Sequence, residues 1–410
     1  MSNLRKTQLA RSHRLVRPRE TVEVGVQLNL LTVNELNVKD QKLSTSGWLT
    51  VQWKDERFNW IPAMHDDIEY FFGIQTEVWR PEIIIDNSIE SLGVLGNNDL
   101  LFRVKYTSEV RWEIPIIFVT HCEVDVTFFP FDTQDCEIEL TSWAYSKSEL
   151  ILEHLGTAVN LEDLRENGEW EIVSSRVLKH ELTEPHETFT QLDFHLTLRR
   201  RPSFYVLHTI LPVVLSSYLS MTVFLLPADS GEKVSYSLTV LLALAVLLTL
   251  ISEMMPSTSL HVSILGIYLG SILVIATLSV LMTVLVLRLY LKPETERKPP
   301  FLLKLVYLCS IILCWDKTCC GGNRHSGRLH KTDNGRSPHF RTVSVIGENG
   351  SGKLKRTLSV EPDKRIATWK EMSEILDRIF FWLFFLIVTI VTIVLFMWLS
   401  MKRNSNVYSH

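Results

Sequence analysis

The first two hundred residues alternate apolar and polar side chains, which is the pattern of β-strands with one buried face. Every second residue from Val22 to Leu30 is apolar, and the same alternation returns from Leu192 to Leu198. Turn signals such as Asp86-Asn87-Ser88 break the stretch between them into short pieces. Because a period of two places alternate side chains on opposite faces of a strand, this region is predicted to be an all-β, immunoglobulin-like sandwich.

Four later runs are apolar and long enough to cross a bilayer, which takes about 20 helical residues. They are Phe204–Leu226, Val234–Ser252, Leu260–Leu287 and Phe380–Leu399. A buried helix of a soluble protein explains one such run but not four, so a four-helix transmembrane bundle is predicted. The predicted domains are 1–201 (sandwich), 202–289 (first three spans), 290–377 (connecting segment), 378–400 (fourth span) and 401–410 (tail).

Cys122 and Cys136 are the only cysteines of the β region. Such a pair predicts one disulfide, which requires an oxidising compartment. The sandwich is therefore expected outside the cell, and four crossings return the C-terminal tail to the same side. Residues 290–377 are then cytoplasmic, in agreement with nine Lys or Arg against three Asp or Glu over 316–360. We expect a multi-pass protein of the plasma membrane, with both termini extracellular and lipid around its spans.

The connecting segment is predicted to contain two helices around a disordered stretch. Residues 299–315 form an interfacial helix, and residues 361–377 form an amphipathic helix that continues into the fourth span. Four cysteines lie between them at a spacing that matches no usual zinc pattern, so free or acylated thiols are expected rather than a metal site. They are Cys309, Cys314, Cys319 and Cys320.

The second span carries polar groups along one helical stripe. On a helix over 233–253, residues three or four apart share a face, and one face is charged at both ends, hydroxylic in its first half and apolar in the middle. Such a stripe is costly against lipid but not around a water-filled axis, where carboxylate rings concentrate cations and an apolar ring closes the pore by dewetting. The predicted pore-lining residues are Glu232, Ser235, Thr239, Leu242, Val246, Thr249, Leu250 and Glu253.

Packing between helices is the alternative explanation, because Ser and Thr hydroxyls are common at helix interfaces in membranes. It accounts for the hydroxyls but not for Glu232 and Glu253 on the same stripe. A single helix cannot enclose a pore, so the pore hypothesis requires a ring of subunits in head-to-tail contact.

Several motifs point to one family. Thirteen residues separate Cys122 from Cys136 and include Phe129-Pro130-Phe131-Asp132. Further motifs are Gly231-Glu232-Lys233, Pro256-Ser257-Thr258-Ser259, Trp79-Arg80-Pro81-Glu82, Gly168-Glu169-Trp170 and Arg200-Arg201-Pro202. Together they resemble the Cys-loop family of pentameric ligand-gated ion channels, and its nicotinic branch in particular.

The resemblance implies a ring-shaped pentamer, in which this subunit and four others conduct cations when a small extracellular ligand binds. It also implies that Phe129, Pro130, Phe131 and Asp132 rest on the linker that begins at Pro256, with Arg200 at the same junction, so that ligand binding is coupled to the pore. No cofactor and no metal is implied.

The resemblance further implies an aromatic cage that binds a cationic amine between subunits. Trp143 matches the central cage tryptophan, and Trp53 matches the tryptophan of the complementary face. The other candidate ligand-binding residues are Asp86, Tyr145, Arg111 and Phe189. Four remaining tryptophans are assigned to the core, namely Trp48, Trp60, Trp79 and Trp170.

The chain departs from the family pattern at two cage loops. Asp86 stands where a tyrosine is expected, and Arg176–Thr190 contains neither the adjacent cysteines nor the tyrosines of the third loop. Acetylcholine in the usual binding mode is therefore not expected. Asp86 has two equal interpretations, as a partner of a cationic ligand or of a neighbouring arginine.

Composition excludes other classes of function. The net charge of −4 lacks the basic excess of a nucleic-acid-binding protein. No nucleophile elbow, metal-ligand spacing or phosphate loop occurs, which argues against an enzyme. Two hypotheses stay open: a ligand-gated cation channel, and an auxiliary subunit of a heteropentamer that lacks a complete agonist site.

Overall fold

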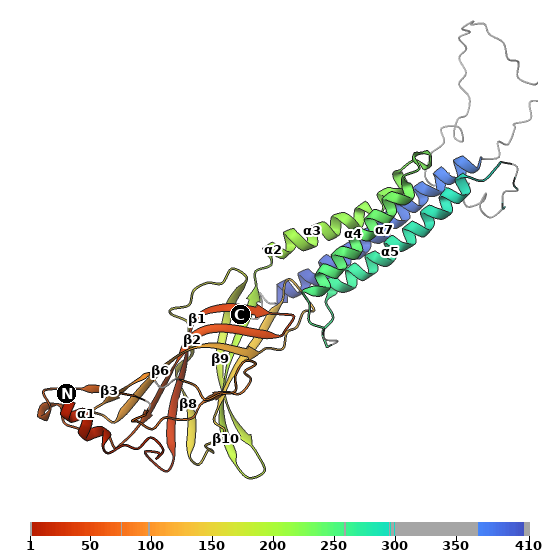
Figure 1. Cartoon of the computed structure of the whole chain (residues 1–410). Helices are drawn as coiled ribbons and strands as arrows, with labels where there is room; N and C mark the ends of the chain where they lie inside the picture. The colour runs from red at the N-terminus through yellow and green to blue at the C-terminus, as the bar shows by residue number, and fades with distance from the viewer. Residues whose placement is uncertain are drawn as a thin grey trace, which may run out of the picture. The chain divides into compact units, whose positions relative to one another are not determined.

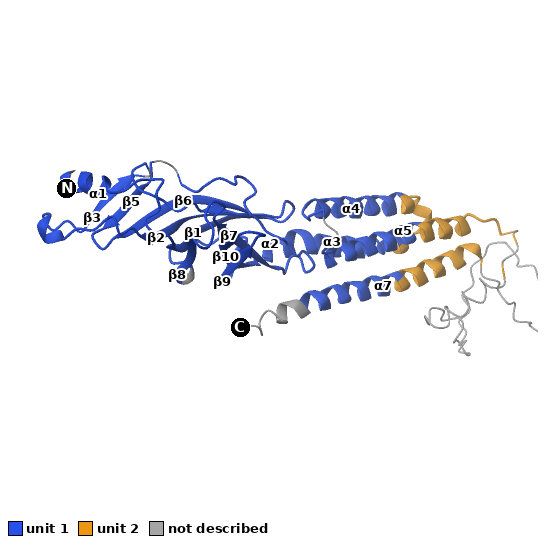
Figure 2. Cartoon of the chain, turned by 90° about the horizontal axis from the view of Figure 1, so that it is seen from below, with its two compact units in different colours: residues 1–223, 235–280, 384–410 blue, residues 224–234, 281–383 orange. Residues whose placement is uncertain are grey.

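The computed structural model describes residues 2–74, 76–96, 99–257, 260–294, 296, 299 and 368–405. They form a β domain and a set of long helices (Figure 1). The chain divides into two compact units, of which one contains residues 1–223, 235–280 and 384–410 and the other residues 224–234 and 281–383 (Figure 2).

The β domain consists of two sheets. One has six strands in the order β3-β5-β6-β2-β1-β8, and the other has four in the order β4-β7-β10-β9. β1 and β8 pair in parallel, and the other ladders of the described residues are antiparallel. The strands are β1 Val22–Asn37, β2 Lys42–Lys54, β3 Tyr70–Ile74, β4 Ile84–Ile85, β5 Leu101–Lys105, β6 Glu109–His121, β7 Thr133–Thr141, β8 Leu150–Asn160, β9 Trp170–Thr183 and β10 Thr188–Arg200, preceded by helix α1, Ser2–Leu9.

The alternating residues of β1 and β10 lie in one hydrophobic core, which confirms the predicted sandwich. The apolar positions of β1 from Val22 to Leu30 are 2% exposed or less, and those of β10 from Leu192 to Leu198 are fully buried. Trp60, Trp79 and Trp170 are also buried in this core, as predicted. Trp48 was assigned to the core wrongly, because its side chain is partly exposed on β2.

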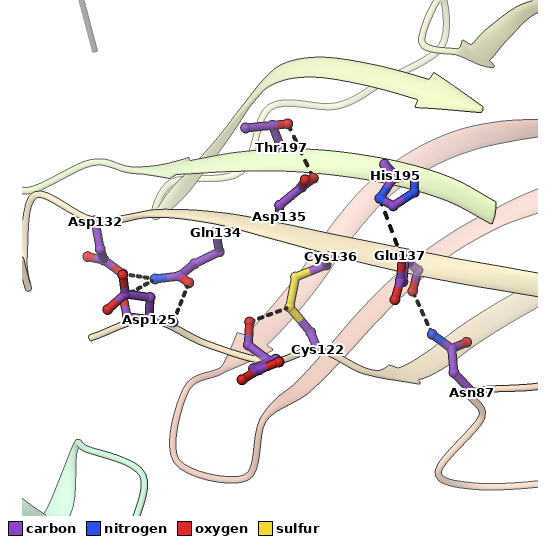
Figure 3. Close-up of a disulfide and its surroundings, with 11 residues drawn as sticks. Asn87, Cys122, Asp125, Asp132, Gln134, Asp135, Cys136, Glu137, His195 and Thr197 are labelled. Atoms are coloured by element: carbon purple, nitrogen blue, oxygen red, sulfur yellow. Dashed lines mark hydrogen bonds and ion pairs between the residues drawn. A yellow bond between two sulfur atoms is a disulfide. The ribbon is translucent and has the colours of Figure 1, made fainter. Parts of the chain in front are cut away.

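The predicted disulfide is present between Cys122 and Cys136. Cys122 follows β6 of the six-stranded sheet and Cys136 belongs to β7 of the four-stranded sheet, so the bond links the two layers (Figure 3). Inside the closed loop, the amide of Gln134 donates to the Asp132 carboxylate at 2.6 Å and to the main-chain oxygen of Asp125 at 2.9 Å. The loop is therefore held by its own side chains as well as by the covalent bond.

Among the residues that the structure describes, four helical segments are long and apolar enough to cross a membrane, as the sequence predicts. They cover Ser203–Leu225, Lys233–Glu253 (α4), Ile264–Tyr290 (α5) and Trp369–Ser400, the last being most of helix α7, Trp369–Ser405. The first is irregular, with α2 (Ser203–Tyr205), a π-helical turn η2 (Val206–Ile210), α3 (Leu211–Leu219) and a final 3-10 turn η3 (Thr222–Leu225). Pro212 opens α3 and has no N–H to donate to the preceding turn, which accounts for the wide turn before it.

Helix α7 confirms that the amphipathic segment continues into the fourth span without a break from Trp369 onward. Trp369, Met372 and Leu376 pack against Val286 of α5. The part of the predicted helix before residue 368, the predicted helix 299–315 apart from residue 299, and the four cysteines of the connecting segment lie outside the described residues. The predicted tail begins within α7, because the helix continues to Ser405.

Trp369 also joins the two sides of the connecting segment. Its main-chain N–H donates to the Glu294 carboxylate at 2.8 Å, and the Lys292 ammonium lies 5.2 Å from the centroid of its indole ring. The end of α5 and the beginning of α7 are therefore held next to each other.

Candidate functional site

The polar stripe predicted for the second span lies on the exposed face of α4. All eight predicted positions, from Glu232 to Glu253, are exposed, and Leu242 in the middle of the stripe is 65% exposed. Ser237, Leu244 and Ile251 mark the opposite, buried face. Of the four spans, α4 buries the smallest share of its most apolar stretch, 17% against 22–39% for the others. No other described part of the chain thus covers this face.

The hydroxyl groups of this stripe bond to their own helix. Thr239 donates to the main-chain oxygen of Tyr236, and Thr249 donates to that of Val246, both at 2.8 Å. Neither bond joins α4 to another helix, which is what the helix-packing explanation requires of these two residues. Each hydroxyl oxygen keeps its lone pairs, which are available to water.

Arg200 is the centre of a buried charged cluster at the end of β10, where the first span begins. Its side chain is 2% exposed and donates to both oxygens of Asp132, at 2.8 and 3.2 Å, and to Glu169 at 2.6 Å. The guanidinium lies 4.1 Å from the centroid of a Trp170 ring and 5.2 Å from that of Tyr205. A guanidinium stacked on aromatic faces and paired to carboxylates in this way is rigidly fixed.

The disulfide loop contacts the first and third spans. The Phe129 ring lies 5.0 Å from that of Tyr205 at the start of the first span, and the bond between Phe129 and Pro130 is cis. The main-chain N–H of Ile264, the first residue of α5, donates to the oxygen of Thr127 at 3.0 Å. The His261 ring and the Asp125 carboxylate are 3.5 Å apart.

The predicted coupling residues lie close together, but not every predicted contact between the loop and the linker is present among the described residues. Asp132 and Arg200 are paired, and Phe129, Pro130 and Pro256 are buried while Phe131 is half-buried. The loop contacts His261 of the linker and Ile264 of α5, whereas part of the predicted Pro256–Ser259 stretch lies outside the described residues.

Trp143 is presented at the surface by a loop that a single carboxylate holds. Glu82 accepts hydrogen bonds from the main-chain N–H groups of Trp143 and Ala144, at 3.1 and 2.9 Å, and from the Ser142 hydroxyl. The indole is 54% exposed, and its N–H donates to Asp86 at 3.0 Å. The Asp86 carboxylate therefore accepts a hydrogen bond from Trp143, and not from an arginine.

Trp53 does not fit the predicted ligand site. It is 3% exposed and packs edge-on against Trp79 and Phe102 in the sandwich core, with ring centroids 6.0 and 5.8 Å apart. β2 alternates its faces, so the tryptophan on this strand that reaches the surface is Trp48. The sequence alone does not show which of the two tryptophans is buried, because one strand holds both.

The other predicted ligand residues lie on different elements. Tyr145 is half-buried, and its hydroxyl oxygen accepts a bond from the Trp79 indole at 3.4 Å. Phe189 is half-buried on β10 opposite Leu182 of β9. Arg111 is exposed on β6 of the other sheet and pairs with Glu113 at 2.7 Å.

A group of acidic side chains lies on the four-stranded sheet beside Asp86. The main-chain N–H of Asp86 donates to the Glu139 main-chain oxygen at 2.9 Å, and Gln191 donates to Glu139 at 3.2 Å and to Asp193 at 2.7 Å. Burial, followed by repulsion from Glu137, Asp193 and Asp86, raises the pKa of Glu139 to about 7. Two histidines face the same group, His180 at 3.1 Å from Asp193 and His195 at 3.5 Å from Glu137.

Comparison with known proteins connects these features. The description "Neurotransmitter-gated ion-channel ligand binding domain" matches residues 2–202, and "Neurotransmitter-gated ion-channel transmembrane region" matches residues 209–309. The chain is 31% identical to the neuronal acetylcholine receptor subunit alpha-6 of Mus musculus, over 95% of this chain and 90% of the relative. The chain belongs to the neurotransmitter-gated ion-channel family.

Further relatives are nicotinic subunits as well. The chain is 36% identical to the alpha-3 subunit of Bos taurus, over 68% of this chain and 56% of the relative. It is 36% identical to the alpha-6 subunit of Homo sapiens, over 72% of this chain and 61% of the relative. The matched region thus spans less than two thirds of these two relatives, although it spans nearly the whole of the mouse subunit. The nicotinic resemblance drawn from the motifs is confirmed.

Sequence reasoning missed several residues of this ligand-gated channel subunit. Glu82, which holds the Trp143 loop, was visible only as part of a motif. Tyr205 and His261 gave no signal, because one is an aromatic residue at the edge of an apolar run and the other a lone histidine. Glu139 is one of many alternating polar residues of a strand, and only its surroundings distinguish it.

Proposed function

We propose that the chain assembles into a pentamer and forms a cation-selective channel that an extracellular ligand opens. The observation that carries this proposal is the exposed stripe of α4, with carboxylates at Glu232 and Glu253 and an apolar middle at Leu242 and Val246. An exposed apolar face is expected of any helix in lipid. A face with two carboxylates and six hydroxyl or apolar side chains between them is favourable only where it meets water.

Each part of the stripe has a role in this proposal. The carboxylates at the two ends attract cations and repel anions as rings of charge. The hydroxyls of Ser235 and Thr239 replace part of the hydration of a passing ion. The apolar ring of Leu242 and Val246 closes the pore by excluding water, and a small rotation or tilt of α4 opens it.

The ligand is proposed to bind where Trp143 is exposed. An indole face attracts cations, and Asp86 beside it adds a full negative charge. This combination favours a small cation that also donates hydrogen bonds, rather than one recognised by an all-aromatic cage. Tyr145 and Phe189 would complete this face, and the neighbouring subunit would contribute Trp48, in place of Trp53, and Arg111.

The charged cluster around Arg200 is proposed to transmit binding to the pore. β10 carries Phe189 near one end and Arg200 at the other, so a shift of this strand moves the start of the first span. The disulfide loop, paired to Arg200 through Asp132, would move with it and act on the linker through His261.

The proposed topology follows from the disulfide. Cys122–Cys136 requires an oxidising compartment, so the sandwich faces the outside of the plasma membrane and residues 290–377 face the cytoplasm. Both termini would then be extracellular. A postsynaptic location is one setting that suits such a receptor.

The first experiment is voltage-clamp recording from cells that express this chain alone, with amines, amino acids and pH changes as stimuli. A cation current supports a homomeric channel and identifies its stimulus. The charge assignment is then tested with Glu232→Ala, which should lower the permeability ratio of cations to anions. Glu184→Ala, in the turn between β9 and β10, is the matched control and should leave the reversal potential unchanged. A reversal potential unaffected by Glu232→Ala would reject the pore assignment.

An auxiliary subunit is the second candidate function. It is favoured by the third cage loop, since Arg176–Thr190 has no cysteine or tyrosine. Silence of the chain alone despite surface pentamers, followed by altered currents on co-expression with a nicotinic subunit, would support this candidate. Full ligand-gated currents from the chain alone would exclude it.

A further inference from the structure

Lys233, the first residue of α4, is buried and paired. Its side chain is 2% exposed, and its ammonium group lies 2.6 Å from the carboxylate of Asp377 on α7, which is 10% exposed. The pair joins residues 144 positions apart in the chain. The neighbouring residue Glu232 is exposed. Two adjacent residues of opposite charge thus have opposite environments.

The residues around this pair in the second unit are packed or paired as well. Phe224 precedes Lys233 in the chain and Phe380 follows Asp377, and these two rings pack against each other with centroids 5.9 Å apart. One helical turn or two before Asp377, the apolar side chains of α7 pack against α5. Two further charges of this region have partners, because the Tyr290 hydroxyl donates to Asp229 and the Lys370 ammonium lies 5.0 Å from the centroid of the Tyr290 ring.

We infer that Asp377 determines the charge of the pore at the end where α4 begins, by neutralising Lys233. This inference rests on the proposed function, because it concerns the ring of Glu232 residues in the pentamer. Lys233 alone would cancel the charge of Glu232 in each subunit and leave the ring neutral. With Lys233 paired to Asp377, one negative charge per subunit remains, and it is the exposed one. Asp377 is thus a positioning residue for selectivity although it does not lie on the pore helix.

Elementary electrostatics supports the inference. A lone charge buried in an apolar bundle is strongly unfavourable, so a buried lysine requires a close counter-charge. The ammonium and the carboxylate are only 2.6 Å apart, so at distances much larger than this their electrostatic potentials largely cancel. Removal of Asp377 leaves one unpaired positive charge beside Glu232 in each subunit, five in the proposed pentamer, and such a charge acts over about a Debye length, roughly 8 Å at physiological salt.

The test compares reversal potentials of full-length channels in a salt gradient. Asp377→Asn should lower the cation-to-anion permeability ratio on the order of tenfold, which is the effect of five screened charges that lie about one Debye length from an ion. Lys233→Arg combined with Asp377→Asn should show at least the same shift, because arginine does not lose its proton. Lys233→Met combined with Asp377→Asn should restore the wild-type ratio. Glu371→Gln is the matched control, since it removes the same charge from an exposed site on the same helix and should have no effect.

The recordings use the stimulus found for the wild type or, if none opens the channel, the Leu242→Thr background. Cation currents in the wild type with an unchanged ratio in Asp377→Asn would overturn this inference and leave the proposed function intact. Absence of cation current in both backgrounds would overturn the proposed function and the inference with it.

Asp377→Asn leaves a buried lysine without its partner, so its surface expression is measured as well. If it fails to reach the surface alone, it is co-expressed with the wild type, and mixed pentamers should show conductance levels below the wild-type level. Only the wild-type level, with the variant present at the surface, would contradict the inference. Failure of both Asp377→Asn and its combination with Lys233→Met to reach the surface would also overturn it, since the pair would then serve assembly instead of pore charge.

Discussion

Replacement of Arg200 by glutamine tests whether the cluster at the end of β10 holds the β domain together. The substitution removes the bonds to Asp132 and Glu169 and leaves the Asp132 carboxylate, which is 2% exposed, without a counter-charge. Loss of one partner of a buried ion pair costs about 3–5 kcal/mol. That free energy corresponds to an increase of roughly 10²-fold or more in the unfolded fraction.

The expected shift is large enough to measure by heating. A domain of about 200 residues loses roughly 2–4 °C in its unfolding midpoint per kcal/mol, so Arg200→Gln should lower the midpoint by about 6–20 °C. The assay is the fraction of the detergent-solubilised full chain that elutes as intact oligomer after heating. Because heating such proteins is often irreversible, all variants are heated at one rate and compared with each other.

Two further variants separate burial from charge in this experiment. Arg199→Gln breaks a pair with Glu171 that is 2.9 Å long but 45% exposed on both sides, and exposed pairs contribute only about 0–1 kcal/mol. Arg200→Met combined with Asp132→Leu removes both buried charges and should recover a large part of the loss. An Arg200→Gln midpoint no lower than that of Arg199→Gln would refute the reasoning.

Three other predictions concern the gate, the disulfide and pH. Leu242→Thr should raise the standing cation current of unstimulated cells, because a hydroxyl ring no longer excludes water; an unchanged current at equal surface expression would reject the gate. Cys122→Ser with Cys136→Ser removes a bond between residues 14 positions apart and should cost about 3 kcal/mol in the same heating assay; an unshifted midpoint would contradict this. Glu139 holds its proton in the folded state up to pH about 7, above the ordinary carboxyl value, so it should make the wild type lose stability as pH rises to about 7. Glu139→Gln should reduce this loss of stability with pH and be more stable than the wild type above pH about 7. Equal pH dependence of the two forms would show that Glu139 titrates normally.

The elements of the fold were predictable wherever burial imposes a period on the sequence. β1 and β10 alternate because one face meets the core. The four spans are helical because a chain in lipid must satisfy its own backbone hydrogen bonds, and they are apolar because their side chains face lipid. The predicted pore helix 233–253 agrees with α4, whose ends are marked by Gly231, with a positive φ of 70°, and by Pro256. The third span was placed four residues early, because apolar linker residues before Ile264 continue the hydropathy of the helix.

The sites were predictable only in part, since spacing along the chain does not determine which strand face is buried. Trp48 and Trp53 lie five residues apart on one strand, and an odd spacing puts them on opposite faces of it. Which face meets the core depends on the other sheet, so only the structure identifies Trp48 as the partly exposed residue and Trp53 as the buried one. The pairs Lys233–Asp377 and Arg200–Asp132 join distant positions, and no local pattern predicts them.

The contacts of Trp369 have a consequence for how this chain can vary. They hold together two points that are 75 residues apart, through Glu294 and Lys292. Once the ends of a segment are fixed in this way, the entropy of closing it grows only with the logarithm of its length, about 0.6 kcal/mol for each doubling. Insertions and deletions between the two points therefore leave the contact of α5 with α7 nearly as stable as before. The length of this connection is a property that evolution, or an engineer who inserts a reporter domain, can change almost freely.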